Sequence, residues 1–107
     1  MVYSEKFIDE APTREAIDAM PGSVVVEFGA PWCGHCQAAR PHVSSAFSGY
    51  PQVLHLKVED GPGQRLGRSF RVKLWPTLVF LRDGVEVARL VRPTESAPVL
   101  EALAQIA

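Results

Sequence analysis

Apolar positions along the chain follow helical spacing in some segments and strand-like patterns in others. Residues 24–28 form an unbroken, mostly β-branched run around one glutamate, which is typical of a strand buried on both faces. Apolar residues from 33 to 50 recur every three or four positions, which predicts a helix with one buried side, although Pro41 lies inside it. Similar patterns predict helices over 12–20, 64–70 and 96–107, and strands over 53–58, 77–81 and 86–91. Pro12-Thr13 is a signal for the start of the first of these helices.

Short connecting segments indicate how these elements are arranged. Asp83-Gly84 joins the last two predicted strands and is a strong signal for a tight β-hairpin. The helix between strands 24–28 and 53–58 makes those two strands parallel. Residues 1–8, with apolar Phe7 and Ile8, are compatible with a short first strand. We therefore expect one α/β domain over residues 1–107, with a central mixed β-sheet and helices on both faces.

Composition narrows the function without identifying it. The 107 residues include eleven basic and twelve acidic side chains, for a net charge of −1. A nucleic-acid binder usually carries a basic excess, so this balance argues against one. The sequence has no apolar run near the ~18 residues that a membrane span needs. Its first residues do not resemble a secretory signal, which favours a cytoplasmic protein.

Cys33 and Cys36 are the only cysteines. A disulfide-stapled scaffold would need more cysteines closing longer loops, so the pair is better explained by chemistry than by crosslinking. Structural zinc favours four ligands, and only His35, His42 and His55 could add to the pair. We therefore predict no metal and no other cofactor, and we expect His42 on a helix surface and His55 in a strand with an ordinary partner.

The positions of the two cysteines predict different roles. Cys33 falls at the start of a helix, where unpaired N–H groups and the helix dipole stabilise a thiolate. Cys36 lies nearly one turn later on the apolar side of the helix. Its sulfur is therefore expected to be more buried than that of Cys33 and to be able to reach it. Cys33 is thus expected to attack a substrate disulfide and Cys36 to resolve the mixed disulfide. Gly34 and His35 lie between them, and a protonated His35 would make the disulfide more oxidising.

The segment 30–36, which reads APWCGHC, resembles the active site of thioredoxin-fold oxidoreductases, and 75–77 and 83–84 extend the resemblance. It implies a thioredoxin fold and a thiol–disulfide oxidoreductase that reduces or exchanges protein disulfides. It also implies a cis bond before Pro76, whose backbone neighbours pair with substrate. We expect a monomer that is regenerated by a thioredoxin-reductase-like protein or another thiol electron donor. The size resembles thioredoxin, whereas the CGHC motif resembles protein disulfide isomerase.

Two charged residues match the same family. Glu27 lies within an apolar strand, which is a costly place for a carboxylate. In the family an acid at this position helps to move a proton to or from the buried cysteine, here Cys36, and a lysine on the neighbouring strand matches Lys57. The alternative is that Glu27 is a partly solvated residue at the end of the sheet.

Several positions depart from the thioredoxin pattern and leave the substrate open. Gly29 replaces the usual aromatic residue and is expected to open space beside the motif. Trp75 precedes Pro76 and is expected to cover the cysteines or stack on substrates, with Trp32 on the exposed rim. Arg92 replaces a usual glycine and predicts a narrower, more basic groove. These departures keep two rival functions open: a binding or chaperone-like module with secondary redox activity, and an electron relay for one dedicated enzyme.

Overall fold

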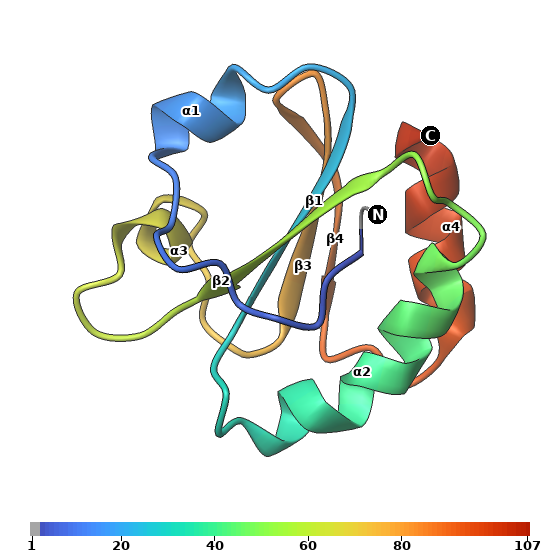
Figure 1. The fold of residues 1–107 in the computed structure, drawn as a ribbon, viewed down its shortest axis with the longest axis horizontal. Coiled ribbons are helices and arrows are strands. Elements are labelled where there is room, and N and C mark those ends of the chain that lie inside the picture. The colour runs from blue at the N-terminus through green and yellow to red at the C-terminus, as the bar shows by residue number, and fades with distance from the viewer. Residues whose placement is uncertain (1–2) are drawn as a thin grey trace.

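The computed structural model describes residues 3–107 as a four-stranded sheet with four helices. The strands lie in the order β2-β1-β3-β4, with β1 parallel to β2 and antiparallel to β3, and with β4 antiparallel to β3 (Figure 1). The elements in chain order are α1 (Arg14–Asp18), β1 (Ser23–Gly29), α2 (Gly34–Phe47), β2 (Leu54–Glu59), α3 (Arg65–Ser69), β3 (Thr77–Arg82), β4 (Val85–Val91) and α4 (Ser96–Ile106).

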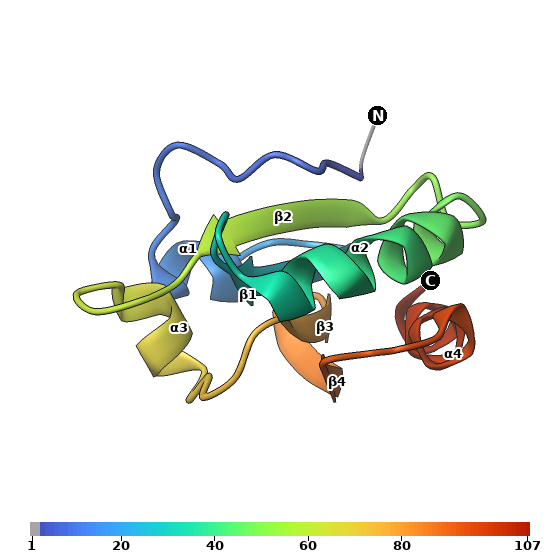
Figure 2. The same ribbon diagram turned by 90° about the horizontal axis from the view of Figure 1, so that it is seen from below.

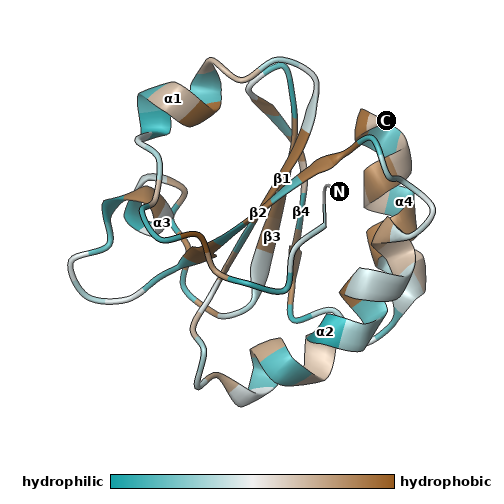
Figure 3. Cartoon of the chain, in the orientation of Figure 1, coloured by the Kyte–Doolittle hydropathy of each residue, from teal (hydrophilic) through white to brown (hydrophobic). Residues whose placement is uncertain are grey.

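Helices cover both faces of the sheet, as the sequence predicts. Helices α1 and α3 lie on one side and α2 and α4 on the other (Figures 1 and 2). Alternate residues of β1 supply the two cores: Val25 packs with α2 and α4, whereas Val26 and Phe28 pack with α1 and α3. Figure 3 shows the hydrophobic residues concentrated along the central strands. Within residues 3–107, no helix combines the length and apolar character that crossing a membrane requires.

The N-terminal segment differs from its prediction. Residues 3–8 run beside β2 but form no strand, and Met1 and Val2 lie outside the described residues. One backbone hydrogen bond joins the segment to β2, from the N–H of Ile8 to the carbonyl oxygen of Lys57 at 2.9 Å. The N–H of Ser4 instead donates to a side chain, the Nδ1 atom of His55, at 3.2 Å. A strand needs a ladder of backbone pairs. One backbone bond and one bond to a side chain do not make such a ladder, so no strand forms.

Two local signals in the sequence are confirmed by the backbone. Thr13 caps α1, because its Oγ1 atom accepts a hydrogen bond from the N–H of Ala16 at 3.1 Å. Asp83 and Gly84 form the β3–β4 turn with φ angles of 51° and 80°, as a two-residue hairpin of this type requires. A Cβ atom at Gly84 would also collide with the backbone of Asp18, so this turn has room only for glycine.

Candidate active site

The two cysteines lie where β1 leads into α2. Cys33 is the N-cap residue of α2, and its Sγ atom accepts a hydrogen bond from the backbone N–H of Cys36 at 3.2 Å. Both residues are free thiols and are only 6% and 5% exposed. An amide donor and the positive end of a helix dipole both favour negative charge on sulfur. The local fold therefore places the Cys33 sulfur at the start of α2 with an amide donor directed at it.

Cys36 lies in the opposite environment. Burial is the main cause that raises its pKa, to about 12, and a hydrogen bond to Cys33 adds to the effect. The negative charge of Glu27 raises the pKa of Cys36 further, whereas a backbone bond at Ala30 lowers it. Cys36 is thus kept as a thiol and must lose its proton before it can act as a nucleophile.

Gly29 does not open space beside the motif, so that expectation is wrong. A Cβ atom at this position would lie 2.7 Å from the Sγ atom of Cys36. The sulfur itself therefore fills the room that a larger residue at Gly29 would occupy. The small residue at the end of β1 lets α2 place Cys36 directly against the sheet.

Trp75 packs against both cysteines and Ala30, so it partly covers the pair. Its indole Nε1 donates to the Oδ2 atom of Asp60 at 2.9 Å, and its ring meets Trp32 edge-on with centroids 5.4 Å apart. The Trp75-Pro76 bond is cis, as the family resemblance implies. Trp32 itself is 73% exposed. The two indoles thus form one rim of the site, and sequence reasoning missed the aspartate that anchors it.

Arg92 lies on the other side of Pro76 in a left-handed conformation, with φ of 51°. Such a backbone costs a non-glycine residue about 1 kcal/mol. Its Nε atom donates to the carbonyl oxygen of Trp75 at 2.8 Å, and its backbone N–H donates to the carbonyl oxygen of Pro76 at 2.9 Å. With His35 and His42, Arg92 lines a hollow of about 140 Å³. These groups bring a basic surface to the motif.

Glu27 is buried in the centre of the sheet and is not a partly solvated residue at its end. It is 2% exposed, and its Oε1 atom lies 2.7 Å from the Nε2 atom of His55, which is 3% exposed. Lys57 stands opposite Glu27 in the strand register, but its Nζ atom donates to the carbonyl oxygen of Glu5 at 3.2 Å. The carboxylate at this site is therefore bonded to a histidine of β2, and Lys57 bonds elsewhere.

Sequence reasoning misses the contact between His55 and Glu27, because it predicts only an ordinary partner for His55. The signal for it lies in the parallel register of β1 and β2, where Val25 stands opposite His55 and Glu27 opposite Lys57. Side chains two residues apart in a strand share a face. His55, Lys57 and Glu27 therefore lie on the side of the sheet that α2 covers.

Lys57 does lie near the resolving cysteine, although it does not bond Glu27. Lys57 and Cys36 line a common hollow of about 220 Å³ between the N-terminal segment and the start of α2, together with Glu5 and Arg40. Cys36 therefore shares this hollow with the charged side chains of Glu5 and Arg40, which are exposed. The structure thus brings all four predicted catalytic residues into one region: Cys33, Cys36, Glu27 and Lys57.

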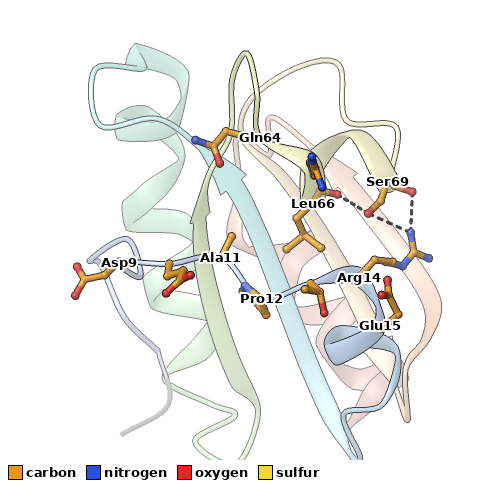
Figure 4. Close-up of a pocket in the computed structure, with 11 residues that line it drawn as sticks. Asp9, Ala11, Pro12, Arg14, Glu15, Gln64, Leu66 and Ser69 are labelled. Carbon is orange, nitrogen blue, oxygen red and sulfur yellow. Dashed lines mark hydrogen bonds between the residues drawn. The ribbon is translucent and has the colours of Figure 1, made fainter.

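A separate hollow of about 590 Å³ lies between the segment before α1 and helix α3 (Figure 4). Arg14 points across it, and its Nη1 atom donates to the carbonyl oxygen of Ser69 at 2.7 Å. The guanidinium also stacks over the Phe70 ring at 3.8 Å. No cysteine lines this hollow, and Arg14 joins α1 to α3 through its bond to Ser69. Across residues 3–107, no three His, Cys, Asp or Glu side chains are grouped to hold a metal ion.

Comparison with known proteins gives a consistent result. The Thioredoxin family model matches residues 6–105. The structure of thioredoxin 2 from Pseudomonas aeruginosa PAO1 in its reduced form is 58% identical, with a TM-score of 0.86 over 97% of this chain and 96% of that one. Fasciola hepatica thioredoxin is 28% identical, with a TM-score of 0.71 over 84% of this chain and 86% of that one. These matches confirm the predicted thioredoxin fold.

Curated relatives match over shorter segments. Human protein disulfide-isomerase A2 is 47% identical over 66 residues, which cover 58% of this chain and 13% of that protein. The H-type thioredoxin of Fagopyrum esculentum is 34% identical over 68 residues, which cover 64% of this chain and 59% of that protein. The chain therefore spans less than two thirds of the length of these relatives.

Proposed function

The chain belongs to the thioredoxin family, and we propose that it is a thiol–disulfide oxidoreductase that reduces or exchanges protein disulfides. The observation that carries this proposal is the asymmetry of the cysteine pair. The sulfur of Cys33 accepts an amide hydrogen bond at the start of α2, whereas burial keeps Cys36 protonated. We also propose that residues 1–107 act as a single domain and a monomer.

The reaction follows from this asymmetry. The Cys33 thiolate attacks one sulfur of a substrate disulfide, forms a mixed disulfide and releases the other sulfur as a thiolate. Cys36 then gives its proton to Glu27 and attacks the Cys33 sulfur. The second substrate thiol leaves, and the two electrons of the dithiol have passed to the substrate. The Cys33–Cys36 disulfide must then be reduced by a thioredoxin-reductase-like protein or another thiol donor.

The experiment that tests this function is insulin reduction by cysteine variants. Cys33→Ser should abolish turnover, because it removes the attacking sulfur. Cys36→Ser should trap a covalent mixed disulfide, because Cys33 still attacks but nothing displaces the substrate. Mass spectrometry of the trapped adduct checks the second result. Parental turnover by Cys33→Ser would disprove the proposed function.

The residues between the cysteines bear on the direction of electron flow. Gly34 and His35 are both exposed and lie between the two cysteines. A cationic side chain stabilises the thiolate of the reduced form. We expect a reduction potential between the thioredoxin value of about −270 mV and the isomerase value of about −180 mV. Equilibration with glutathione followed by alkylation measures it, and a potential at or below the thioredoxin value would contradict this role of His35.

The rim residues are the proposed contacts with substrate. Trp32 offers a large exposed ring, and Trp75, whose peptide bond to Pro76 is cis, packs against the cysteine cluster. Arg92 contributes positive charge and directly bonds the Trp75 carbonyl. A cytoplasmic location, with electron transport from a thiol donor to protein disulfides, suits a chain whose two cysteines both belong to the site.

A second function is favoured by the same exposed rim. Trp32 is 73% exposed, and such a side chain is a common anchor for a protein partner. The chain would then be a binding or chaperone-like module for a dedicated partner, with secondary redox activity. A partner that binds the Cys33→Ser, Cys36→Ser double variant with unchanged affinity would favour this function. Broad reduction of unrelated protein disulfides would favour the oxidoreductase.

A further inference from the structure

We propose that His55 is a positioning residue for the resolving step: it holds Glu27 as an oriented carboxylate that accepts the proton of Cys36. This inference rests on the proposed oxidoreductase function and extends it to a residue outside the cysteine motif. It starts from the 2.7 Å contact between the Nε2 atom of His55 and the Oε1 atom of Glu27.

The hydrogen bonds of His55 define its tautomer. The Nδ1 atom accepts from the backbone N–H of Ser4 at 3.2 Å, so this nitrogen carries no proton. The proton of the neutral imidazole is therefore on Nε2, where it donates to the Glu27 carboxylate. Protonating Nδ1 would break the bond to Ser4. His55 thus acts as a donor to the Glu27 carboxylate through Nε2 and as an acceptor through Nδ1.

Packing fixes the imidazole in this orientation. The Tyr3 ring stacks on His55 with centroids 4.6 Å apart, and the Phe47 ring meets its edge at 5.0 Å. The side chain of His55 has no exposed surface. One Glu27 oxygen is therefore held at a fixed place, and no hydrogen bond from residues 3–107 occupies the other oxygen, Oε2.

A neutral donor has a specific consequence for a buried carboxylate. Without a hydrogen-bond donor, a carboxylate buried at the position of Glu27 would be costly. With a lysine in contact, its charge would be largely cancelled. The Nζ atom of Lys57 instead donates to the Glu5 carbonyl and lies 4.9 Å from the centroid of the Phe7 ring. His55 therefore stabilises the Glu27 carboxylate without neutralising its charge.

The charge of Glu27 acts on Cys36. It is one of the causes that raise the pKa of the Cys36 thiol, and Glu27 precedes Gly29 by two residues on the same face of β1. The other titratable or charged groups around this region come from α2, from β2 and from the N-terminal segment: Cys33, Arg40, Lys57, Tyr3 and Glu5.

The step balances within the protein. The S–H bond of Cys36 breaks, and its proton forms an O–H bond on Glu27. The sulfur electron pair forms the S–S bond with Cys33, and the bond from Cys33 to the substrate breaks. The substrate sulfur leaves with that electron pair as a thiolate. His55 keeps its own proton throughout, which is why its role is positioning.

Two substitutions of His55 distinguish the effect of its N–H donor from the effect of its aromatic ring. His55→Phe keeps the aromatic packing with Tyr3 and Phe47 but removes the donor. His55→Gln keeps an N–H donor but loses the ring. The reduced full chain of each variant is mixed with an aromatic disulfide whose released thiolate absorbs visible light. Attack by Cys33 gives the first phase of release, and resolution by Cys36 gives the second.

We expect His55→Phe to leave the first phase unchanged and to slow the second about tenfold at neutral pH, as part of the roughly hundredfold effect of losing a general base. The second phase of His55→Phe should then rise steeply with pH, because hydroxide replaces Glu27 as the proton acceptor. His55→Gln should restore most of the rate. In a Glu27→Gln background, His55→Phe should have no further effect, because the base is already lost.

Other outcomes would overturn the inference. A second phase of His55→Phe with native rate and pH profile would show that the donor is not needed. Equal slowing by both variants, or loss of the folded circular dichroism spectrum in both, would show that His55 serves packing alone. If the parental chain gave no second phase, the proposed oxidoreductase function would itself fail, which is a distinct result.

Discussion

The active site has an exposed rim and a buried floor, and they are built in different ways. The rim consists of Trp32, Trp75 and Arg92, which loops place around the cysteines and which use backbone and aromatic contacts. The floor consists of Glu27 and His55, which two parallel strands hold under α2 with almost no exposure. Surface groups that contact a partner can be exchanged at small structural cost, whereas buried charges need an exact set of partners.

This difference assigns separate tasks to the two regions. The floor acts on the proton of Cys36, because a buried negative charge and burial both favour the thiol over the thiolate. We propose that a protein substrate approaches Cys33 along the rim. Changes in the floor should therefore alter the chemistry and stability of the cysteine pair, and changes in the rim should mainly alter substrate affinity.

The largest expected effect concerns the pH dependence of Cys36. In a Cys33→Ser chain the only thiol is Cys36, and burial, the main cause of its raised pKa, remains. Its alkylation by iodoacetamide should be very slow at neutral pH and should keep rising beyond pH 9.0, the ordinary thiol value. The same chain in denaturant is the control, and its rate should level off near that value. A native rate that levelled off there too would remove the distinction between the buried floor and the exposed rim.

The same shift makes a prediction for stability. Above pH 9.0 the unfolded thiol loses its proton while the folded one retains it up to about pH 12. The unfolded state then binds fewer protons, so the free energy of unfolding falls as pH rises through this window. The contribution of Cys36 is fully present below pH 9.0. Cys36→Ala should make the alkaline decline shallower, as urea unfolding at several pH values would show.

The next effect concerns the contact between the floor and α2. Gly29→Ala would place a Cβ atom 2.7 Å from the Sγ atom of Cys36, so the sulfur must move. We expect a loss of about 1–3 kcal/mol in the free energy of unfolding, measured with urea. Gly34→Ala is the matched control, since nothing lies within 4 Å of its added Cβ, and it should be neutral or stabilise by up to about 1 kcal/mol. In a Cys36→Ala background, which has no sulfur there, Gly29→Ala should cost almost nothing.

The fold and the cysteine pair are predictable from the sequence because their signals are local. Thr13, the β-branched run of β1 and the Asp83-Gly84 turn each specify their own structure, and the structure confirms all three. The roles of Cys33 and Cys36 follow from their positions at the start of one helix. The helical period and the break in the chain after β1 are enough to predict these two positions.

The missed features depend on contacts between distant segments. Sequence spacing does not show that His55 reaches Glu27 instead of Lys57, because the choice depends on how the N-terminal segment crosses β2 and takes up the lysine. The error at Gly29 has a similar cause. A small residue leaves space only if no neighbouring element fills it. Here α2 places the Cys36 sulfur against Gly29 and fills that space.

The smallest expected effect lies in the rim. Arg92→Gly would relieve a left-handed backbone, a gain of about 1 kcal/mol, but would remove the hydrogen bond from Nε to the Trp75 carbonyl, a loss of about 1 kcal/mol. The free energy of unfolding should therefore change by less than about 1 kcal/mol, well below the effect of Gly29→Ala. Loss of the side chain also frees the Trp75 carbonyl oxygen as an acceptor at the rim, so the KM for a protein disulfide should fall. Arg92→Lys is the comparison, because it keeps the charge without the planar guanidinium that bonds this carbonyl. A rise in KM for Arg92→Gly, rescued by Arg92→Lys, would instead show that positive charge at the rim attracts the substrate.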